Sequence, residues 1–370
     1  MEYLALEEDK VGVDKVAIYK AVSGLIFDDT FDTLDSRWII SPTGSARVNS
    51  GCLRIEHSDP QTLALFNLPD ETNLMLEVTA DYIPSEPGDE GGIVVWQSAL
   101  NKLEFLESLD TKISEYTVWR AVKRGNLWTF YAKRDGQWEL FDSAVLDAPM
   151  AGVSLKNGST GGYMSLNVNE VVLCRSASIT IGNVLPGNKV VLYDELQNAV
   201  DTKVVPTGYS GVEFILPSAI FKGTVKLFAD QAAVSPIGEV GPVEFCGGDI
   251  YLYGFDIDVY WNGVELSKTG FTDLGKMYNG VIEEMLQVVN NADVDAFDVT
   301  LSIKQYLNEF VWQWADVAPD AGGTPGVYGD TIALGTLAPG ESRDFWIRVE
   351  KADNMFIFKN EHFVIDIQHG

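Results

Sequence analysis

Positive charge is scarce in this chain of 370 residues, in which 26 lysines and arginines stand against 54 aspartates and glutamates. The formal net charge is −28. A surface of this sign repels phosphate backbones and anionic membrane surfaces. We therefore expect no nucleic-acid partner and no insertion into a membrane.

Cysteine and histidine are also rare, with three residues of each. The histidines show no metal-ligand spacing, and the sequence contains no GxSxG, GxxxxGK[ST] or HExxH motif. The cysteines lack CxxC spacing, which favours buried, reduced thiols over disulfides or zinc ligands; they are Cys52, Cys174 and Cys246. We expect a protein without enzymatic activity.

Long apolar runs are missing as well, because no stretch of about 18 apolar residues occurs. The first residues, MEYLALEEDKVGVDK, lack the basic and apolar regions of a secretory signal peptide. We therefore expect synthesis and folding in a cytoplasm.

Helical patterns are few, and the best candidate is MYNGVIEEMLQVVNN, residues 277–291, whose Val, Ile and Leu content also suits a strand. Elsewhere, short β-branched and aromatic runs are separated by Gly, Pro, Asn and Asp, as is typical of all-β proteins. In residues 73–82, NLMLEVTADY, five apolar residues share one parity while Glu77, Thr79 and Asp81 share the other, which predicts a strand with one buried face. The predicted inward residues are Leu74, Leu76, Val78, Ala80 and Tyr82.

The length predicts two or three hydrophobic cores. Turn spacing and composition divide the chain into an N-terminal arm (1–24), a large sandwich (25–176), a small immunoglobulin-like β-sandwich (177–247) and a C-terminal β-sandwich (248–370). The arm contains alternating apolar residues. It either adds a strand to a neighbouring subunit's sheet or opens the first domain's own sheet.

Residues 117–143, TVWRAVKRGNLWTFYAKRDGQWELFDS, combine aromatic and basic residues. The turns KRGN and RDGQ predict three antiparallel strands near 116–122, 127–133 and 137–143. Alternation in the second strand sends Trp128, Phe130 and Ala132 to the core and Leu127, Thr129 and Tyr131 to the other face. The expected core partners are Val118, Val122, Trp138 and Leu140, with Trp119 on the opposite face. We interpret the basic residues of the hairpin ends as solubilising: Lys123, Arg124, Lys133 and Arg134.

A resemblance follows from FDDTFDTLDSRW, GCLRIEH, GGIVVWQSALNKLEFLES, the 117–143 stretch and AGVSLKNG. Together these segments resemble a concanavalin A-like (laminin G-like) jelly-roll sandwich over about 150 residues. This superfamily includes lectins, glycosidases, accessory modules and virion proteins, so that the resemblance implies a fold and leaves the function open.

Glycosidases of this superfamily place two carboxylates on one face of a strand. Here Glu104 and Glu107 differ in parity and point to opposite faces of an unbulged strand, which argues against a catalytic pair. A carbohydrate-binding face fits better, because sugars stack on exposed aromatic rings. The candidates are Trp96, Gln97, Trp119, Arg120 and Tyr131, although these rings also suit a sandwich core.

The same resemblance implies a possible calcium ion, because concanavalin-like folds often hold one through aspartate and backbone oxygens. The acidic stretch DDTFDTLD supplies Asp28, Asp29 and Asp32 as candidate ligands. Its spacing matches no known calcium loop. We expect no other cofactor.

The C-terminal phrase LGTLAPGESRDFWIRVEK, residues 334–351, is similar to small β-sandwich modules of structural proteins from tailed bacteriophages. This resemblance implies a virion component of the tail, baseplate or capsid surface, assembled with copies of itself and other virion proteins. Its concanavalin A-like domain would lie outermost and bind host glycans. A stand-alone carbohydrate-binding protein or glycosidase relative is the other hypothesis.

Overall fold

The computed structural model describes residues 3–8, 17–56, 60–109, 117–156, 164–254, 256–266, 272–276, 280–305, 311–350 and 361–369. These residues form β-strands and one short 3-10 helix, η2 (Val311–Trp314), and they contain no α-helix. The expected all-β fold is confirmed. The best helical candidate is instead strand β26 (Val281–Asn290), in agreement with its β-branched content. Within the described residues, no helix could span a membrane.

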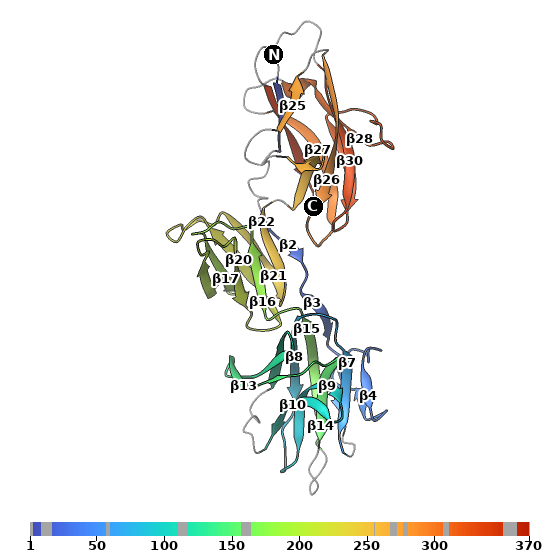
Figure 1. Ribbon diagram of the computed structural model, residues 1–370, viewed down its shortest axis with the longest axis vertical. Helices are drawn as coiled ribbons and strands as arrows, with labels where there is room; N and C mark the ends of the chain where they lie inside the picture. The colour runs from blue at the N-terminus through green and yellow to red at the C-terminus, as the bar shows by residue number, and fades with distance from the viewer. Residues whose placement is uncertain are drawn as a thin grey trace.

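Three β units follow one another along the long axis of the molecule (Figure 1). The first unit, at the lower end, contains two sheets that pack face to face around one core. We call them the β9 sheet and the β11 sheet. The β9 sheet has the order β10 (Asn101–Ser108), β9 (Glu90–Ser98), β14 (Met150–Lys156), β7 (Thr62–Asn67) and β4 (Ile39–Ser41). The β11 sheet has the order β13 (Gln137–Val145), β12 (Leu127–Arg134), β11 (Val118–Arg124), β8 (Asn73–Asp81), β15 (Leu166–Cys174), β6 (Leu53–Ile55) and β5 (Ala46–Val48), with β3 (Leu25–Asp29) also paired to β15.

The middle unit and the C-terminal unit are each a further pair of sheets with its own core. One sheet of the middle unit has the order β19 (Gly211–Ile215), β16 (Ser178–Gly182), β22 (Ile250–Gly254) and β2 (Ala17–Val22). Its other sheet has the order β18 (Ala199–Val204), β17 (Lys189–Asp194), β20 (Ile220–Phe228) and β21 (Gly238–Cys246). One sheet of the C-terminal unit has the order β25 (Thr272–Lys276), β1 (Tyr3–Glu8), β31 (Glu361–Gln368), β27 (Ala296–Gln305) and β29 (Thr331–Leu337). Its other sheet has the order β24 (Val264–Glu265), β23 (Ile257–Trp261), β26, β30 (Ser342–Glu350) and β28 (Ala315–Pro319).

The first three strands of the chain enter three different units. Strand β1 lies between β25 and β31 in the C-terminal unit, β2 pairs with β22 in the middle unit, and β3 pairs with β15 in the first unit. The first unit is therefore inserted between β2 and β16, and both of these units are inserted between β1 and β23. The predicted domain limits stay a prediction, but strands β2 and β22 extend the middle unit beyond 177–247.

Neither interpretation of the N-terminal arm matches these pairings. The arm adds no strand to the first unit's sheet before β3, and its strands β1 and β2 pair within the same chain. Ile18 shows why the pairing is favourable, since its side chain is buried in the middle unit's core. An alternating apolar segment indicates a strand, but it does not indicate which sheet receives it.

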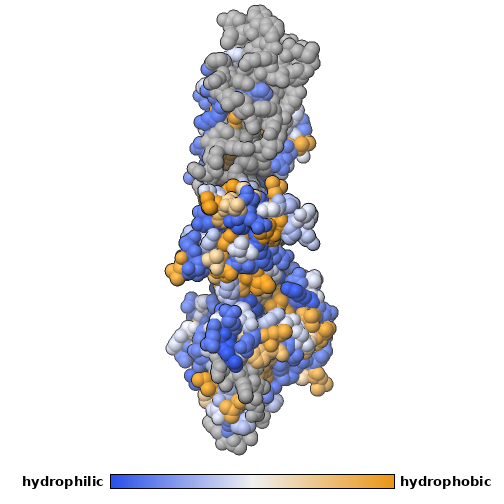
Figure 2. Space-filling view, turned by 90° about the vertical axis from the view of Figure 1, so that its left-hand side faces the viewer, coloured by the Kyte–Doolittle hydropathy of each residue, from blue (hydrophilic) through white to orange (hydrophobic). Residues whose placement is uncertain are grey.

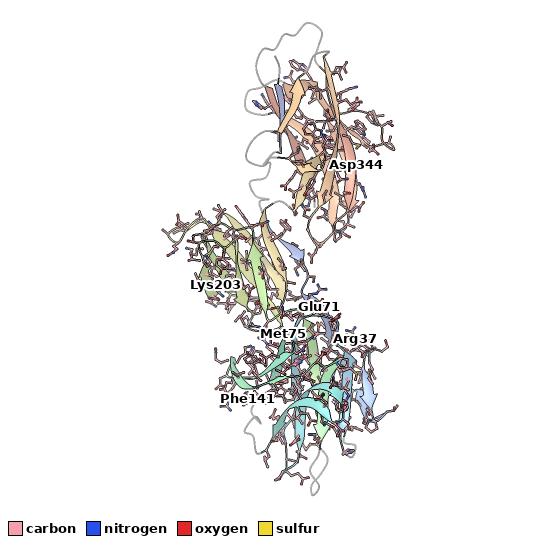
Figure 3. All side chains as sticks on the ribbon, in the orientation of Figure 1. Arg37, Glu71, Met75, Phe141, Lys203 and Asp344 are labelled. Atoms are coloured by element: carbon pink, nitrogen blue, oxygen red, sulfur yellow. The ribbon has the colours of Figure 1, made fainter. Side chains whose placement is uncertain are left out.

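Strand β8 has the predicted inward face. Leu74, Leu76, Val78 and Ala80 are fully buried in the first unit's core. The other face of β8 is also buried, because Met75 is fully buried and Glu77 is 8% exposed. Figure 3 places Met75 at the end of the first unit that faces the middle unit. The outer side of β8 is therefore covered by the middle unit at this end.

The predicted meander exists as strands β11, β12 and β13. Its turns have positive φ at Gly125 (60°), Asp135 (49°) and Gly136 (78°), as the sequence predicts. Trp128, Phe130 and Ala132 face the core, as expected.

The predicted sides of the two neighbouring strands were wrong. Trp119 pairs with Ala132, so that it lies in the core, and Arg120 pairs with Tyr131 on the outer side. The core lacks the four expected partners, Val118, Val122, Trp138 and Leu140. Strand β11 has apolar residues of both parities, and an irregularity beside Phe130 sets the register of β13, so that Leu140 pairs with Tyr131.

The surface outside the junctions is mixed. On the face shown in Figure 2, hydrophobic residues of the middle and first units lie in separate groups among hydrophilic ones.

Among the cysteines, Cys174 and Cys246 are buried, Cys52 is half-buried, and all three are free. The expectation of buried, reduced thiols therefore holds for two of the three positions.

Candidate functional site

The outer face of the β11 sheet meets the middle unit through a buried ion pair. Arg120 on β11 donates from Nε and Nη2 to Oε2 of Glu77 on β8, at 2.9 and 2.5 Å. The same carboxylate oxygen accepts the backbone N–H of Ala219 in the middle unit at 3.1 Å. Arg120 also donates from Nη1 to the carbonyl of Leu216 at 3.3 Å. A charged pair of one unit thus binds the backbone of the next.

Trp138 on β13 adds a second set of contacts to the same loop. Its indole Nε1 donates to the carbonyl of Pro217 at 3.0 Å, and Lys133 Nζ donates to that carbonyl at 3.1 Å. The Arg120 guanidinium lies 4.0 Å from the centroid of the Trp138 ring, within the range of a cation–π interaction. The loop 216–219 is therefore held by four side chains of the first unit, those of Glu77, Arg120, Lys133 and Trp138.

A small apolar cluster completes this junction. Met75 and Cys174 of the first unit pack with Ala219 and Cys246 of the middle unit. Burial raises the pKa of both thiols, to about 11 for Cys246. At Gly247 a β-carbon would lie 2.0 Å from the carbonyl oxygen of Ser176, so that no larger residue fits this close approach. Side-chain and backbone contacts together fix the two units against each other.

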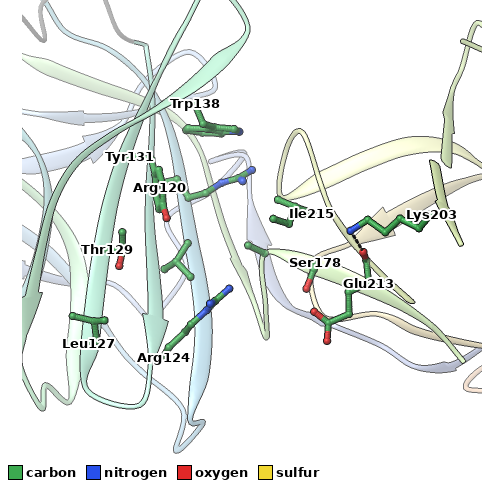
Figure 4. Close-up of a pocket in the computed structure, with 12 residues that line it drawn as sticks. Arg120, Arg124, Leu127, Thr129, Tyr131, Trp138, Ser178, Lys203, Glu213 and Ile215 are labelled. Carbon is green, nitrogen blue, oxygen red and sulfur yellow. Dashed lines mark hydrogen bonds between the residues drawn. The ribbon is translucent and has the colours of Figure 1, made fainter. Parts of the chain in front are cut away.

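Beside this junction lies a cleft of about 390 Å³. Strands β11, β12 and β13 form one wall, and strands β16, β18 and β19 form the other (Figure 4). Its volume lies near the lower end of the range of roughly 300–1,000 Å³ for small-molecule sites. It is lined by Arg120, Val122, Arg124, Leu127, Thr129, Tyr131, Trp138, Ala177, Ser178, Lys203, Glu213 and Ile215.

The cations of the cleft differ in their partners. Arg120 is bound to Glu77, and Lys203 donates to the carbonyl of Glu213 at 2.5 Å and lies 3.6 Å from Asp201. Within the described residues, Arg124 and the Glu213 carboxylate have no hydrogen-bond or ion-pair partner. Figure 4 shows these two side chains extending from opposite walls toward the gap. They are free to bind a ligand.

The outer face of the β9 sheet carries a different arrangement. Trp96 and Met150 lie against buried Leu63, Leu65 and Val94. Gln97 is exposed on the same strand as Trp96 and accepts a hydrogen bond from Asn101. The Lys102 ammonium lies 5.5 Å from the centroid of the Trp96 ring. This face therefore combines one aromatic ring with polar neighbours.

Glu104 is the centre of an ion-pair network on that face. Lys102 and Lys156 lie 2.6 and 2.8 Å from its carboxylate, and Gln61 donates to it at 2.6 Å. Burial opposes ionisation, but the hydrogen bonds from Lys102, Lys156 and Gln61 hold the pKa of Glu104 below its ordinary value. Glu104 is thus an ionised, fully engaged carboxylate.

Glu107 lies on the other side of the same strand, as its parity predicts. Its side chain is 1% exposed, and burial raises its pKa to about 8, with the nearby Trp119 indole opposing the shift. Glu104 and Glu107 therefore do not flank a common space. A glycosidase needs two carboxylates on either side of one bond, and this pair does not supply them.

The candidate calcium ligands differ in their surroundings. Asp29 accepts the backbone N–H of Phe31 at 2.9 Å and the Trp38 indole N–H at 2.7 Å, so that protein donors already bind its carboxylate. Asp28 and Asp32 are exposed. Within the described part of the chain, no three acidic, histidine or cysteine side chains come together in a way that could hold a metal ion.

The predicted binding residues occupy three separate places. Arg120 and Tyr131 line the cleft, Trp96 and Gln97 lie on the β9 sheet, and Trp119 is in the core. Sequence reasoning missed Glu77, Arg124 and Glu213, together with the cleft position of Trp138. One signal was present, namely a glutamate in the apolar run LMLEV, since a charged residue there needs a partner if its face is covered.

Comparisons with known proteins identify no family. No family model matches the chain, and no curated protein matches it. One similar solved structure is the GH43 BlXynB protein from Bacillus licheniformis, with a TM-score of 0.35 and 19% identity over 40% of this chain and 39% of that chain. The chain thus spans about two fifths of the length of that protein.

Two further solved structures are similar. The description of one refers to endo-acting O-glycanases that the human gut microbiota express to initiate mucin breakdown. It has a TM-score of 0.26 and 12% identity over 41% of this chain and 99% of that chain. The other concerns botulinum neurotoxin type C and its interaction with two ganglioside molecules, with a TM-score of 0.27 and 9% identity over 94% of this chain and 97% of that chain.

Proposed function

We propose that this protein is a non-enzymatic structural component of a bacteriophage particle, on the tail, baseplate or capsid surface, and that its first unit contacts glycans of the host cell surface. In the particle it assembles with other virion proteins and with copies of itself. The nested order of the three units is the observation that carries this proposal.

The nesting gives the molecule a base and a tip. The first and last described strands, β1 and β31, lie side by side in one sheet of the C-terminal unit. The first unit is at the other end of the molecule (Figure 1). Because the chain passes each junction twice, the first unit is held away from the two chain ends by two connections. This arrangement suits a protein that is anchored through its C-terminal unit and presents its first unit outward.

The C-terminal phrase supports the proposal through resemblance, and its local structure is a turn that connects the two sheets of the C-terminal unit. Strand β29 leads into a Pro339–Gly340 turn, where Gly340 has φ 70°. Glu341 Oε2 accepts the backbone N–H of Ala338 at 2.8 Å and closes the turn. In β30, Phe345, Ile347 and Val349 are fully buried, in the predicted alternation. The turn residues and the buried side chains of β30 therefore have structural roles in the C-terminal unit.

Labelling of the assembled particle tests the proposed orientation. A small gold-binding tag would be inserted at the Asp135–Gly136 hairpin of the first unit, and separately at the N-terminus. Electron microscopy of particles should place the hairpin label farther from the particle axis than the terminal label. Absence of the protein from purified particles, or the reverse order of labels, would overturn the proposal.

A second candidate is a carbohydrate-binding protein that acts alone. The cleft and the Trp96 face favour it, because both combine aromatic rings with polar side chains and need no particle. It predicts glycan binding by the free protein and its absence from particles. A glycosidase relative would also cleave oligosaccharides and would lose this activity in Glu104→Gln. If incubation with polysaccharides gives no cleavage products, the glycosidase hypothesis is excluded.

A further inference from the structure

We propose that the cleft between the first and middle units is a binding site for a short, uncharged saccharide, recognised by Arg124 from one wall and Glu213 from the other. This inference rests on the proposed function in one respect, namely that the ligand is a glycan. It adds the location of the site, the residues that bind the ligand and the ligand's charge.

The polar groups of the cleft suit vicinal hydroxyls. A guanidinium offers several N–H donors in a fixed plane, and an ionised carboxylate offers only acceptors. Neighbouring sugar hydroxyls can accept from the first and donate to the second. Arg124 and Glu213 are free and extend toward the gap from opposite walls (Figure 4). The hydroxyls of Thr129 and Ser178 line the same space.

The charge balance favours an uncharged ligand. Arg120 and Lys203 are already engaged by Glu77 and Asp201, so that among the described residues lining the cleft one free cation and one free carboxylate remain. A sugar acid attracted by Arg124 would be repelled by Glu213. The net charge of −28 adds to that repulsion.

Apolar groups supply the remaining contact. Tyr131 and Leu127 on β12 and Val122 on β11 lie on the first unit's wall, and Ile215 on β19 lies on the other. Tyr131 pairs with Arg120 across the strands, on the outer side of the sheet. A pyranose ring presents a C–H face that packs on aromatic and aliphatic surfaces of this kind. The cleft can thus contact both the ring and its hydroxyls.

The site is formed before the ligand binds. The buried Glu77–Arg120 pair and the bonds to the 216–219 loop hold the two walls in place. Because no rearrangement of the units is needed, less free energy is lost in ordering the site. The volume accommodates a short saccharide at the lower end of small-molecule sites.

Binding measurements on the full chain test this inference. The probes are maltose, lactose, cellobiose, xylobiose, mannobiose and a galacturonic acid disaccharide, first on an array and then by calorimetry. We expect at least one uncharged disaccharide to bind, with an affinity lowered at least tenfold in Arg124→Ala and in Glu213→Gln. Both side chains are exposed, so that thermal unfolding should be unchanged and a loss of binding would not reflect misfolding.

Two control variants separate this inference from the proposed function. Arg47→Ala removes an exposed arginine elsewhere on the first unit, and Trp96→Ala alters the outer face of the β9 sheet; neither should change binding to the cleft. Binding lost in Trp96→Ala and retained in Arg124→Ala would overturn the cleft site and leave glycan binding intact. Preference for the galacturonic acid disaccharide would overturn the ligand class. No binding to any probe would overturn the inference, while particle labelling would still decide the structural role.

Discussion

The two sheets of the first unit each turn one face outward, and these faces differ in what covers them. Part of the outer face of the β11 sheet is covered by the middle unit, which buries Glu77 and Arg120 as an ion pair. The outer face of the β9 sheet has its own ion pairs, but Glu104, Lys102 and Lys156 each retain a fifth or more of their side-chain exposure. Similar charged groups therefore experience two different environments.

This difference separates interactions that hold the units together from those that leave a face available. Ions buried at the junction have lost their water, so that each needs its partner. Ions on the β9 sheet still contact solvent, which replaces part of any interaction that is removed. The following substitutions test this contrast.

We expect the largest effect from Glu77→Gln. The substitution leaves the Arg120 guanidinium buried without its counter-charge and weakens the acceptor for Ala219. Removal of one partner of a buried pair costs about 3–5 kcal/mol in free energy of unfolding. Urea unfolding followed by tryptophan fluorescence measures this change in the free energy of unfolding. Glu56→Gln is the control, because its pairs with Arg47 and Arg54 are exposed to solvent and should contribute at most about 1 kcal/mol. Equal shifts in the two variants would contradict the contrast.

Glu107→Gln should change the pH dependence of stability. Burial raises the pKa of Glu107 from 4.5 to about 8, so that between these values the folded protein binds a proton that the unfolded chain has lost. Stability therefore falls as pH rises through this window, and the glutamine variant lacks that loss. Between about pH 5.5 and about pH 7.5 the variant should gain roughly 3 kcal/mol relative to the parent. A difference that does not vary with pH would contradict this interpretation.

Glu104→Gln, on the other side of the same strand, should show the opposite sign. The pKa of Glu104 is lowered in the folded state, so that its stabilising contribution is present above its ordinary value of 4.5 and is lost as pH falls through the lowered pKa. Because solvent still reaches this network, we expect a loss of about 1 kcal/mol near neutral pH, which shrinks in acid. Acid titration of the unfolding midpoint measures it; a loss that grows toward low pH would refute the assignment.

Local chemistry made parts of this fold predictable from the sequence. The alternation of β8 and the Asp135–Gly136 turn depend on neighbours close in sequence, and both were confirmed. The side on which Trp119 and Trp138 lie was not predictable, because β11 has apolar residues of both parities and an irregularity sets the register of β13. In such strands the partner sheet decides which face is inward.

The candidate site was predictable only in part for a related reason. Arg120 and Tyr131 were among the five predicted carbohydrate-binding residues, and they do line the cleft. Glu213 comes from another unit, more than 80 residues away in the sequence, and the placement of Arg124 opposite it depends on how two sandwiches pack. Nor does the arm sequence indicate that its strands join different sheets, because strand pairing over long distances is set by tertiary contacts.

The smallest effect is expected from Trp138→Phe, at the edge of the covered face. The substitution removes the indole N–H bond to the Pro217 carbonyl, but Lys133 still donates to that oxygen and a phenyl ring can still pack near Arg120. A single neutral hydrogen bond contributes about 0.5–1.5 kcal/mol to the free energy of unfolding. The loss in Trp138→Phe should therefore be about 0.5 kcal/mol or less. Trp128→Phe is the matched control, because its indole donates to the Leu146 carbonyl at 3.2 Å inside the core and its loss leaves a void. Urea unfolding should show a larger loss of unfolding free energy in Trp128→Phe than in Trp138→Phe; the reverse order would mean that the indole of Trp138 at the junction contributes more than an indole in the core.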